Sequence, residues 1–196
     1  MKTILYIHGL SSSGASGTAR HLQTLLPDMR VIAPDLPIDP DEALTMLQRL
    51  VTRECPDIVI GTSMGGMFAQ QLYDCRKILV NPAFHVSRTM RRQIGECPFL
   101  NPRKDGATSY TTMPELCDRY EAMEHRQFDG MTDEAVTRTW AMFGDRDTTV
   151  NCREEYLQRY RNFATFDGEH RLRLEDIRDV VVPLIRQIEL DEHLTE

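Results

Sequence analysis

Residues 58–72 read Ile-Val-Ile-Gly-Thr-Ser-Met-Gly-Gly-Met-Phe-Ala-Gln-Gln-Leu, and this stretch decides the fold. The apolar residues 58–60 predict a buried strand, and residues 67–72 predict a helix. Between them lies Gly-Thr-Ser-Met-Gly, residues 61–65, followed by Gly66. A strand, a Gly-x-Ser-x-Gly turn and a helix in this order are typical of the nucleophile elbow, which holds a serine above the edge of a sheet.

The turn of a nucleophile elbow is so sharp that the serine backbone is strained and the strand passes very close to the helix. The residues two before and two after Ser63 must therefore be small, and both are glycines, Gly61 and Gly65. The motif alone also fits a glycine-rich turn without chemistry. The interpretation therefore depends on whether the chain supplies partners for the Ser63 hydroxyl.

Partners for an elbow serine are expected in the chain order serine, acid, histidine. Downstream of Ser63, an apolar strand-like segment runs into a turn that contains Asp145 and Asp147. A further strand-like segment ends in a turn that contains His170. In open α/β sheets the functional site lies at the carboxyl ends of the strands. We therefore predict that these side chains meet at one edge of the sheet.

The first strand-like segment, residues 3–7, also ends in a characteristic turn, His8-Gly9-Leu10. Acyl transfer requires two backbone N–H donors near the developing oxyanion. We predict the amide of Met64, directly after the serine, and the amide of Leu10 as these donors. Gly9 permits the close approach of this loop, and His8 is expected to have a structural role.

The chain resembles the α/β-hydrolases and, among them, the small YqiA-like (UPF0227) esterases. The matching segments lie between residues 4 and 171 and read Ile-Leu-Tyr-Ile-His-Gly-Leu-Ser-Ser-Ser, Gly-Thr-Ser-Met-Gly-Gly, Val-Asn-Pro-Ala, Phe-Gly-Asp-Arg-Asp and Gly-Glu-His-Arg. The resemblance implies an α/β fold, a three-layer sandwich whose central sheet is mostly parallel and has helices on both faces. It also implies carboxylesterase activity on short- to medium-chain acyl esters, with acyl-CoA thioesters as a further substrate class.

These observations predict a catalytic triad in which Ser63 is the nucleophile and His170 the general base. The acid is either Asp147 or Asp145. The usual spacing in the superfamily puts the acid three residues after the glycine, which is Gly144 here and selects Asp147. Asp145 would then be a turn residue that binds its own backbone.

The length and charge of the chain limit its class. With 196 residues it is expected to form one domain, residues 1–196, without room for a large cap domain. It has 23 basic and 30 acidic residues and a formal net charge of −7, which disfavours nucleic acid as a partner. No cluster of His, Asp or Glu has the spacing of a metal site. We therefore expect a small-molecule ester or thioester substrate and neither a metal nor a cofactor.

The predicted location is cytoplasmic. The apolar run near the N-terminus, residues 4–7, is too short for a signal peptide, and no run approaches the length of a membrane span. The five cysteines are odd in number, widely spaced and without a Cys-x-x-Cys motif. This usage is typical of reduced thiols in an intracellular protein.

Strand and helix patterns alternate along the chain, which predicts a parallel sheet covered by helices. The predicted strands are residues 3–7, 30–33, 57–60, 77–81, 139–143 and 162–166. Besides the elbow helix, the predicted helices are residues 17–26, 40–54, 154–160 and 176–190. In the last of these, Pro183 predicts a kink or an early turn.

Residues 83–135 form an insertion that contains no clear strand. Its length predicts a functional segment. The resemblance to the α/β-hydrolases, which build lids after the strand that follows the elbow helix, implies a helical lid, with an ordinary packing helix as the alternative. Residues 112–115, Thr-Met-Pro-Glu, read as a capping box that opens a helix. A basic group near the start of the insertion either contacts an anionic part of the substrate or is solvated; its members are His85, Arg88, Arg91 and Arg92.

The sequence thus predicts a serine hydrolase that cleaves carboxylic esters or thioesters through an acyl-enzyme. Two alternatives stay open. The same triad serves other reactions, such as acyl transfer to another acceptor or the hydrolysis of peptide or carbon–carbon bonds, because a fold does not fix the chemistry. The second alternative is that the chain is a non-catalytic binding protein with the same fold. The oligomeric state is left open as well.

Overall fold

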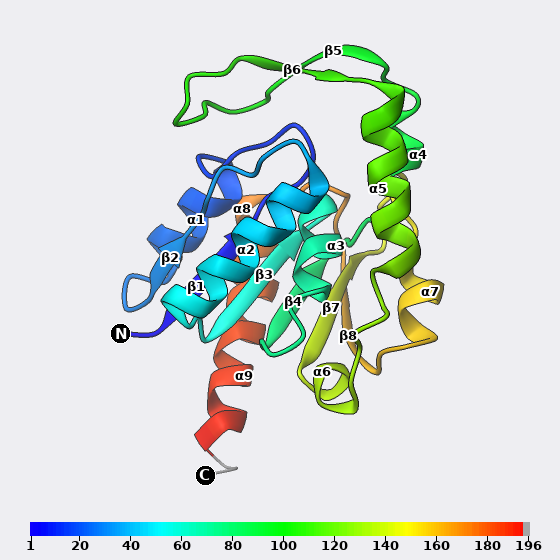
Figure 1. Ribbon diagram of the computed structural model, residues 1–196. Coiled ribbons are helices and arrows are strands. Elements are labelled where there is room, and N and C mark those ends of the chain that lie inside the picture. The colour runs from blue at the N-terminus through cyan, green and yellow to red at the C-terminus, as the bar shows by residue number, and fades with distance from the viewer. Residues whose placement is uncertain (194–196) are drawn as a thin grey trace.

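The computed structural model describes residues 1–193 and contains a six-stranded sheet in the order β2-β1-β3-β4-β7-β8, in which all neighbouring strands are parallel (Figure 1). The predicted α/β sandwich is confirmed, and each predicted strand is present to within two residues at either end. The strands are β1 (Thr3–Ile7), β2 (Arg30–Ile32), β3 (Ile58–Thr62), β4 (Lys77–Val80), β7 (Thr139–Gly144) and β8 (Asn162–Phe166).

Helices cover both faces of the sheet (Figure 1). They are α1 (Gly17–Leu25), α2 (Pro40–Glu54), α3 (Met64–Gln70), α4 (Val86–Met90), α5 (Pro114–Arg126), α6 (Asp133–Thr137), α7 (Arg153–Leu157), α8 (Leu174–Asp176) and α9 (Val182–His193). The start of α2 follows the sequence signal: Pro40 occupies the first turn, and the side chain of Asp39 caps the helix by accepting hydrogen bonds from two backbone amides.

The core consists of two apolar clusters, one on each face of the sheet. Along β1, Leu5 and Ile7 pack in the cluster beneath α2, α3 and α5. Ile4 and Tyr6 belong to the other cluster, which includes residues of α1 and α9. Because successive side chains of a strand point to opposite faces, a strand covered on both sides is apolar throughout. This arrangement fixes the register of the strands and hence the position of the loops at their carboxyl ends.

The insertion differs from its prediction in two respects. It contains an antiparallel hairpin, β5 (Gly95–Pro98) paired with β6 (Ser109–Thr112), so the expectation of no strand in residues 83–135 is wrong. In Figure 1 this hairpin extends as an arm above the carboxyl-terminal edge of the sheet. The predicted capping box is also wrong, because Thr112 lies in β6 and α5 has Met113 as its N-cap, without a side-chain hydrogen bond.

The last helical region is irregular just before Pro183. Residues Ile177–Val181 form a π-helical turn between α8 and α9, and the Val182 amide donates to the Ile177 carbonyl five residues earlier. Proline has no amide to donate and its ring clashes with the preceding turn of an α-helix. The wider π turn relieves that clash, so the predicted interruption lies one turn before the proline. Within residues 1–193, no helix has the length and apolar character needed to cross a membrane.

Candidate active site

Ser63 lies in the turn between β3 and α3 with φ 54° and ψ −120°, a conformation that L-residues rarely adopt. Backbone hydrogen bonds hold it there. Its amide donates to the Val80 carbonyl at 3.0 Å, and its carbonyl accepts from the amides of Gly66 at 2.8 Å and Ala83 at 3.0 Å. The strain at Ser63 is therefore imposed by the backbones of β4 and α3 on either side of it.

The glycines around Ser63 are required by close backbone contacts. A Cβ atom at Gly61 would overlap the carbonyl oxygen of Gly65, and one at Gly65 would overlap the carbonyl oxygen of Ile7. A Cβ atom at Gly66 would lie 2.8 Å from the Cβ atom of Pro82. Gly9 is less restricted, since its added Cβ atom would lie 3.3 Å from the Cβ atom of Ser63.

The structure brings Ser63, His170 and Asp147 into one chain of hydrogen bonds. His170 Nε2 lies 3.0 Å from Ser63 Oγ, and His170 Nδ1 lies 2.7 Å from Asp147 Oδ2. The other carboxylate oxygen of Asp147 accepts from the amides of Thr149 at 2.8 Å and Val150 at 3.0 Å. Of the two candidate acids it is thus Asp147, and not Asp145, that contacts the histidine.

The hydrogen bonds of the three groups determine which nitrogen of the His170 ring carries the proton. The side chain of Asp147 is 4% exposed and that of His170 is 18% exposed. A carboxylate only accepts hydrogen bonds, so the proton on the ring of neutral His170 is assigned to Nδ1. Nε2 then carries the lone pair and faces the hydroxyl of Ser63. This is the arrangement that a general base needs.

Asn81 links the strands that carry these residues, and sequence reasoning assigned it no role. It directly follows β4 and has φ 43°. Its side-chain oxygen accepts from the Gly144 amide at 2.8 Å, and its side-chain nitrogen donates to the carbonyls of Glu169 at 3.0 Å and His170 at 3.2 Å. A polar residue directly after a buried strand was the available signal, in the segment Val-Asn-Pro-Ala.

The loop after β1 lies opposite the elbow. Its residues Gly9 to Ser12 form a turn in which the Ser12 amide donates to the Gly9 carbonyl at 3.2 Å. Leu10 occupies the second position of the turn, and no hydrogen bond from its amide occurs within residues 1–193. The backbone of Ser11, which follows, has φ 59°. The amide of Leu10 thus belongs to the loop after β1, and the amide of Met64 directly follows Ser63 at the start of α3.

The side chain of His8 stabilises this turn through hydrogen bonds of both ring nitrogens. Its Nε2 accepts from the Leu36 amide at 3.2 Å, which leaves the proton on Nδ1 to be donated to the Gly9 carbonyl at 2.8 Å. The ring is 3% exposed, and burial lowers its pKa. A neutral His8 is required because a protonated ring has no lone pair for the Leu36 amide.

Part of the basic group at the start of the insertion is engaged in ion pairs. His85 Nε2 lies 2.7 Å from a carboxylate oxygen of Glu155, and Arg91 lies 2.7 Å from both Asp118 and Glu121. These contacts favour the interpretation of His85 and Arg91 as surface residues that tie α4 to α5 and α7.

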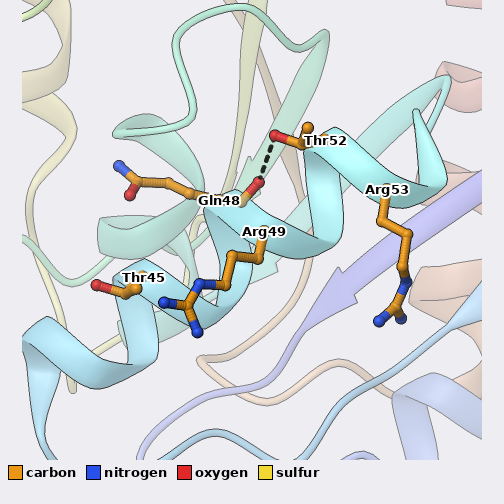
Figure 2. A pocket seen from close by; sticks show the side chains of 5 residues that line it. All are labelled: Thr45, Gln48, Arg49, Thr52 and Arg53. Atoms are coloured by element: carbon orange, nitrogen blue, oxygen red, sulfur yellow. Dashed lines mark hydrogen bonds between the residues drawn. The ribbon is translucent and has the colours of Figure 1, made fainter.

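Two hollows of the surface are lined by residues other than the triad. One hollow, of about 380 Å³, lies along a face of α2, and all the side chains that line it project from this helix (Figure 2). The other, of about 400 Å³, lies between the start of α2, β6 and α5 and is lined by Asp39, Thr111, Met113, Glu115, Leu116 and Arg119. Among residues 1–193, no group of three or more His, Cys, Asp or Glu side chains is arranged to hold a metal ion.

Several solved structures have the same architecture. Est1E from Butyrivibrio proteoclasticus is 16% identical with a TM-score of 0.68, over 96% of this chain and 88% of that chain. The methylesterase MES16 from Arabidopsis is 14% identical with a TM-score of 0.60, over 97% and 100%. Alpha/beta hydrolase domain-containing protein 10 from mouse is 12% identical with a TM-score of 0.62, over 95% and 90%. At these identities the likeness shows the fold alone.

The sequence itself matches a family described as "Uncharacterised protein family (UPF0227)" over residues 3–186, nearly its whole length. The strand order, the elbow at Ser63 and the solved structures agree with that match. The chain therefore belongs to the UPF0227, or YqiA-like, family and has the α/β-hydrolase fold.

Proposed function

We propose that the protein is a serine hydrolase that cleaves carboxylic esters, thioesters included, through an acyl-enzyme intermediate. The observation that carries this proposal is the chain of hydrogen bonds from Ser63 through His170 to Asp147, built on a strained turn at the carboxyl edge of the sheet. The name of one solved neighbour, a methylesterase from Arabidopsis, agrees with ester hydrolysis on this fold.

In the first half of the reaction, Ser63 Oγ attacks the substrate carbonyl while its proton passes to His170 Nε2. Asp147 stabilises the imidazolium that results, without taking its proton. The amides of Met64 and Leu10 donate hydrogen bonds to the oxyanion of the tetrahedral intermediate. When the intermediate collapses, the bond to the alcohol or thiol breaks, and His170 returns the proton to that leaving group.

In the second half, water attacks the acyl-enzyme carbonyl and gives its proton to His170. Collapse of this second intermediate releases the carboxylic acid and restores the Ser63 hydroxyl. A serine hydroxyl is a weak nucleophile at neutral pH, so both halves depend on the base. The packed glycines of the elbow keep the hydroxyl within reach of the histidine throughout.

The test combines labelling with turnover. We expect one fluorophosphonate adduct by intact-protein mass on the wild type and none on Ser63→Ala. Hydrolysis of p-nitrophenyl esters of graded chain length should fall by about 10³-fold or more in Ser63→Ala and in His170→Ala. The exposed His125 on α5 provides a matched control, since His125→Ala should retain activity. Undiminished esterase activity in Ser63→Ala would contradict the proposal.

The alternatives give different results in the same test. An inert Ser63 in folded wild-type protein would favour a non-catalytic binding protein. An adduct on Ser63 without turnover of esters or thioesters would favour another reaction on the same triad. We also propose a cytoplasmic location, because all five cysteines are free thiols, as is typical of proteins in a reducing compartment.

A further inference from the structure

We infer that Tyr110, in the β5–β6 hairpin of the insertion, is a positioning residue that holds the Leu10 amide in place as an oxyanion donor. The inference rests on the proposed function, because it assigns a role in that reaction. It goes further by giving the insertion a task other than covering the substrate.

The turn that presents the Leu10 amide has an unfavourable residue in it. The Ser12 amide donates to the Gly9 carbonyl, so Leu10 and Ser11 are the two central residues of a β-turn. Ser11 has φ 59° at the second central position, where turns of this kind require glycine or asparagine. A serine in this conformation is strained and persists only where its surroundings hold it.

The surroundings that hold Ser11 come from the hairpin. The Leu100 amide donates to the Ser11 carbonyl at 2.7 Å, and the hydroxyls of Ser11 and Tyr110 form a hydrogen bond at 2.8 Å. Both the backbone and the side chain of the strained residue are therefore fixed by a segment far along the chain.

The hairpin also holds the next residues of the loop. The Asn101 side chain donates to Ser12 Oγ at 3.1 Å, and Ser13 Oγ donates to the Pro102 carbonyl at 2.7 Å. Three successive serines of the loop thus contact the hairpin. These contacts agree with Figure 1, in which the arm formed by β5 and β6 lies above the loops at this edge of the sheet.

Tyr110 is itself closely packed. The residue is 8% exposed, and the centroid of its ring lies 5.0 Å from that of Phe99. The Arg103 guanidinium lies 4.5 Å from the centroid of the Phe99 ring. Burial raises the pKa of Tyr110, so the phenol keeps its proton at neutral pH. A buried phenol on a packed ring is a fixed anchor for the Ser11 hydroxyl.

The position of the Leu10 amide follows from the conformation of Ser11, because both belong to the same two-residue turn. An oxyanion donor acts only when it is aimed at the charge that develops in the transition state. Relaxation of Ser11 toward negative φ would turn the Leu10–Ser11 segment and misalign the donor. The loss would affect the transition state and not the bound ester, and so would appear in kcat.

The experiment measures hydrolysis of p-nitrophenyl butyrate by Tyr110→Phe, which removes only the hydroxyl. Losing an oxyanion donor outright costs about 10²- to 10³-fold in kcat, so a misaligned donor should cost roughly tenfold, with KM changed by less than about twofold. Inhibition by a trifluoromethyl ketone, whose hemiketal carries an oxyanion, should weaken by the same factor. The matched control is Tyr73→Phe, which removes a phenol that donates to the Gln127 carbonyl at 2.8 Å, and it should leave kcat unchanged.

Variants of Ser11 separate positioning from general damage. Ser11→Ala keeps the strain and loses the hydroxyl, so it should match Tyr110→Phe, and the double variant should be no worse than either. Ser11→Gly adopts positive φ without strain, so it should retain most of the activity and be insensitive to Tyr110→Phe.

Each result has one meaning. A Ser63-dependent turnover that Tyr110→Phe leaves unchanged would overturn the inference alone. An equal loss in Tyr73→Phe, or additive losses in Ser11→Ala and Tyr110→Phe, would do the same. Wild-type protein without Ser63-dependent turnover would overturn the proposed function and this inference with it. Urea unfolding of each variant verifies that the protein measured is folded.

Discussion

Ser63 and Ser11 are both serines with a positive φ, and they lie on the elbow and on the loop after β1, the two turns that form the candidate site. Among the described non-glycine residues, only these two, Cys55 and Asn81 have positive φ. Ser63 is held by backbone atoms of the strand and helix beside it, together with glycines that allow the close approach. Ser11 is held by Leu100 and Tyr110 of a distant hairpin.

The difference lies in what each turn tolerates. The Ser63 turn depends on the absence of atoms, because an added Cβ at Gly61 or Gly65 would overlap a backbone carbonyl. The Ser11 turn depends on hydrogen bonds with the hairpin, one from the Leu100 amide to its carbonyl and one between its hydroxyl and that of Tyr110. A backbone-held turn should fail abruptly when a methyl group is added. A turn held by separate hydrogen bonds from a distant hairpin should lose function in graded steps.

The largest effect is expected from Gly65→Ala, which adds a Cβ atom where the Ser63 turn has no space for one. The new Cβ atom would overlap the Ile7 carbonyl in a buried central strand, where neither side can move freely. The free energy of unfolding should fall by about 3 kcal/mol or more, with loss of esterase activity. Gly17→Ala in α1 is the matched control, since nothing lies within 4 Å of its added Cβ atom. Urea unfolding measures both, and equal stabilities would refute a backbone-held elbow.

An intermediate effect is expected at Asn81. Its backbone has a positive φ, and its side chain makes hydrogen bonds to residues far along the chain. Asn81→Gly keeps the left-handed backbone but removes the hydrogen bonds to Gly144, Glu169 and His170. We expect a loss of about 1–3 kcal/mol in stability and about tenfold in kcat, because the loop that carries His170 is freed. Asn162→Ala also removes an amide that bridges two backbone carbonyls, at a different edge of the sheet, and should lower stability without changing kcat. Similar kcat losses in the two variants would contradict the positioning role.

The smallest effect is expected from His8, which supports the Ser11 turn from within the core. Its ring is neutral because burial lowers its pKa, while the charges of Asp35 and Arg103 act in opposite directions. Below about pH 6.5 the unfolded chain takes up a proton at His8 that the folded chain resists. This residue therefore contributes stability that is present above that pH and declines as the pH falls.

The measurement is the free energy of unfolding between pH 5 and pH 8. His8→Asn cannot titrate, so its stability should decline less steeply toward pH 5 than that of the wild type. His125→Asn, at an exposed position on α5, should follow the wild-type curve. If His8→Asn and the wild type have parallel curves, the histidine is not a neutral support of the turn.

The sequence was most informative where the type of a residue itself reveals its surroundings. The inner strands of the sheet, β1, β3, β4 and β7, show their burial on both faces as largely apolar runs, and the elbow shows its close packing as glycines. The hairpin was missed because β5 reads Gly-Glu-Cys-Pro, which lacks β-branched and aromatic residues, and is stabilised by pairing with β6. Its existence depends on a partner strand that a local pattern does not reveal.

The residues of the candidate site differ in the same way. Ser63 and His170 were selected by their turns and their chain order, and Asp147 by the spacing after Gly144 that is usual in the superfamily. The structure brings the three side chains into contact, while their catalytic role stays a proposal. Asn81 was assigned no role because its partners lie 63, 88 and 89 positions away. The capping box failed because pairing of Thr112 within β6 outweighed a local helix signal.

The separation between Ser11 and Tyr110, 99 positions, also has a consequence for synthesis of the chain. The partners of the elbow are complete once β4 and Ala83 have left the ribosome. The clamp on Ser11 follows only after Tyr110, and His170 later still. At the usual pace of translation the interval between Val80 and His170 is on the order of ten seconds. A nascent chain therefore carries Ser63 and the partners of its turn before it carries His170, so in the proposed mechanism the hydroxyl has no base during that interval.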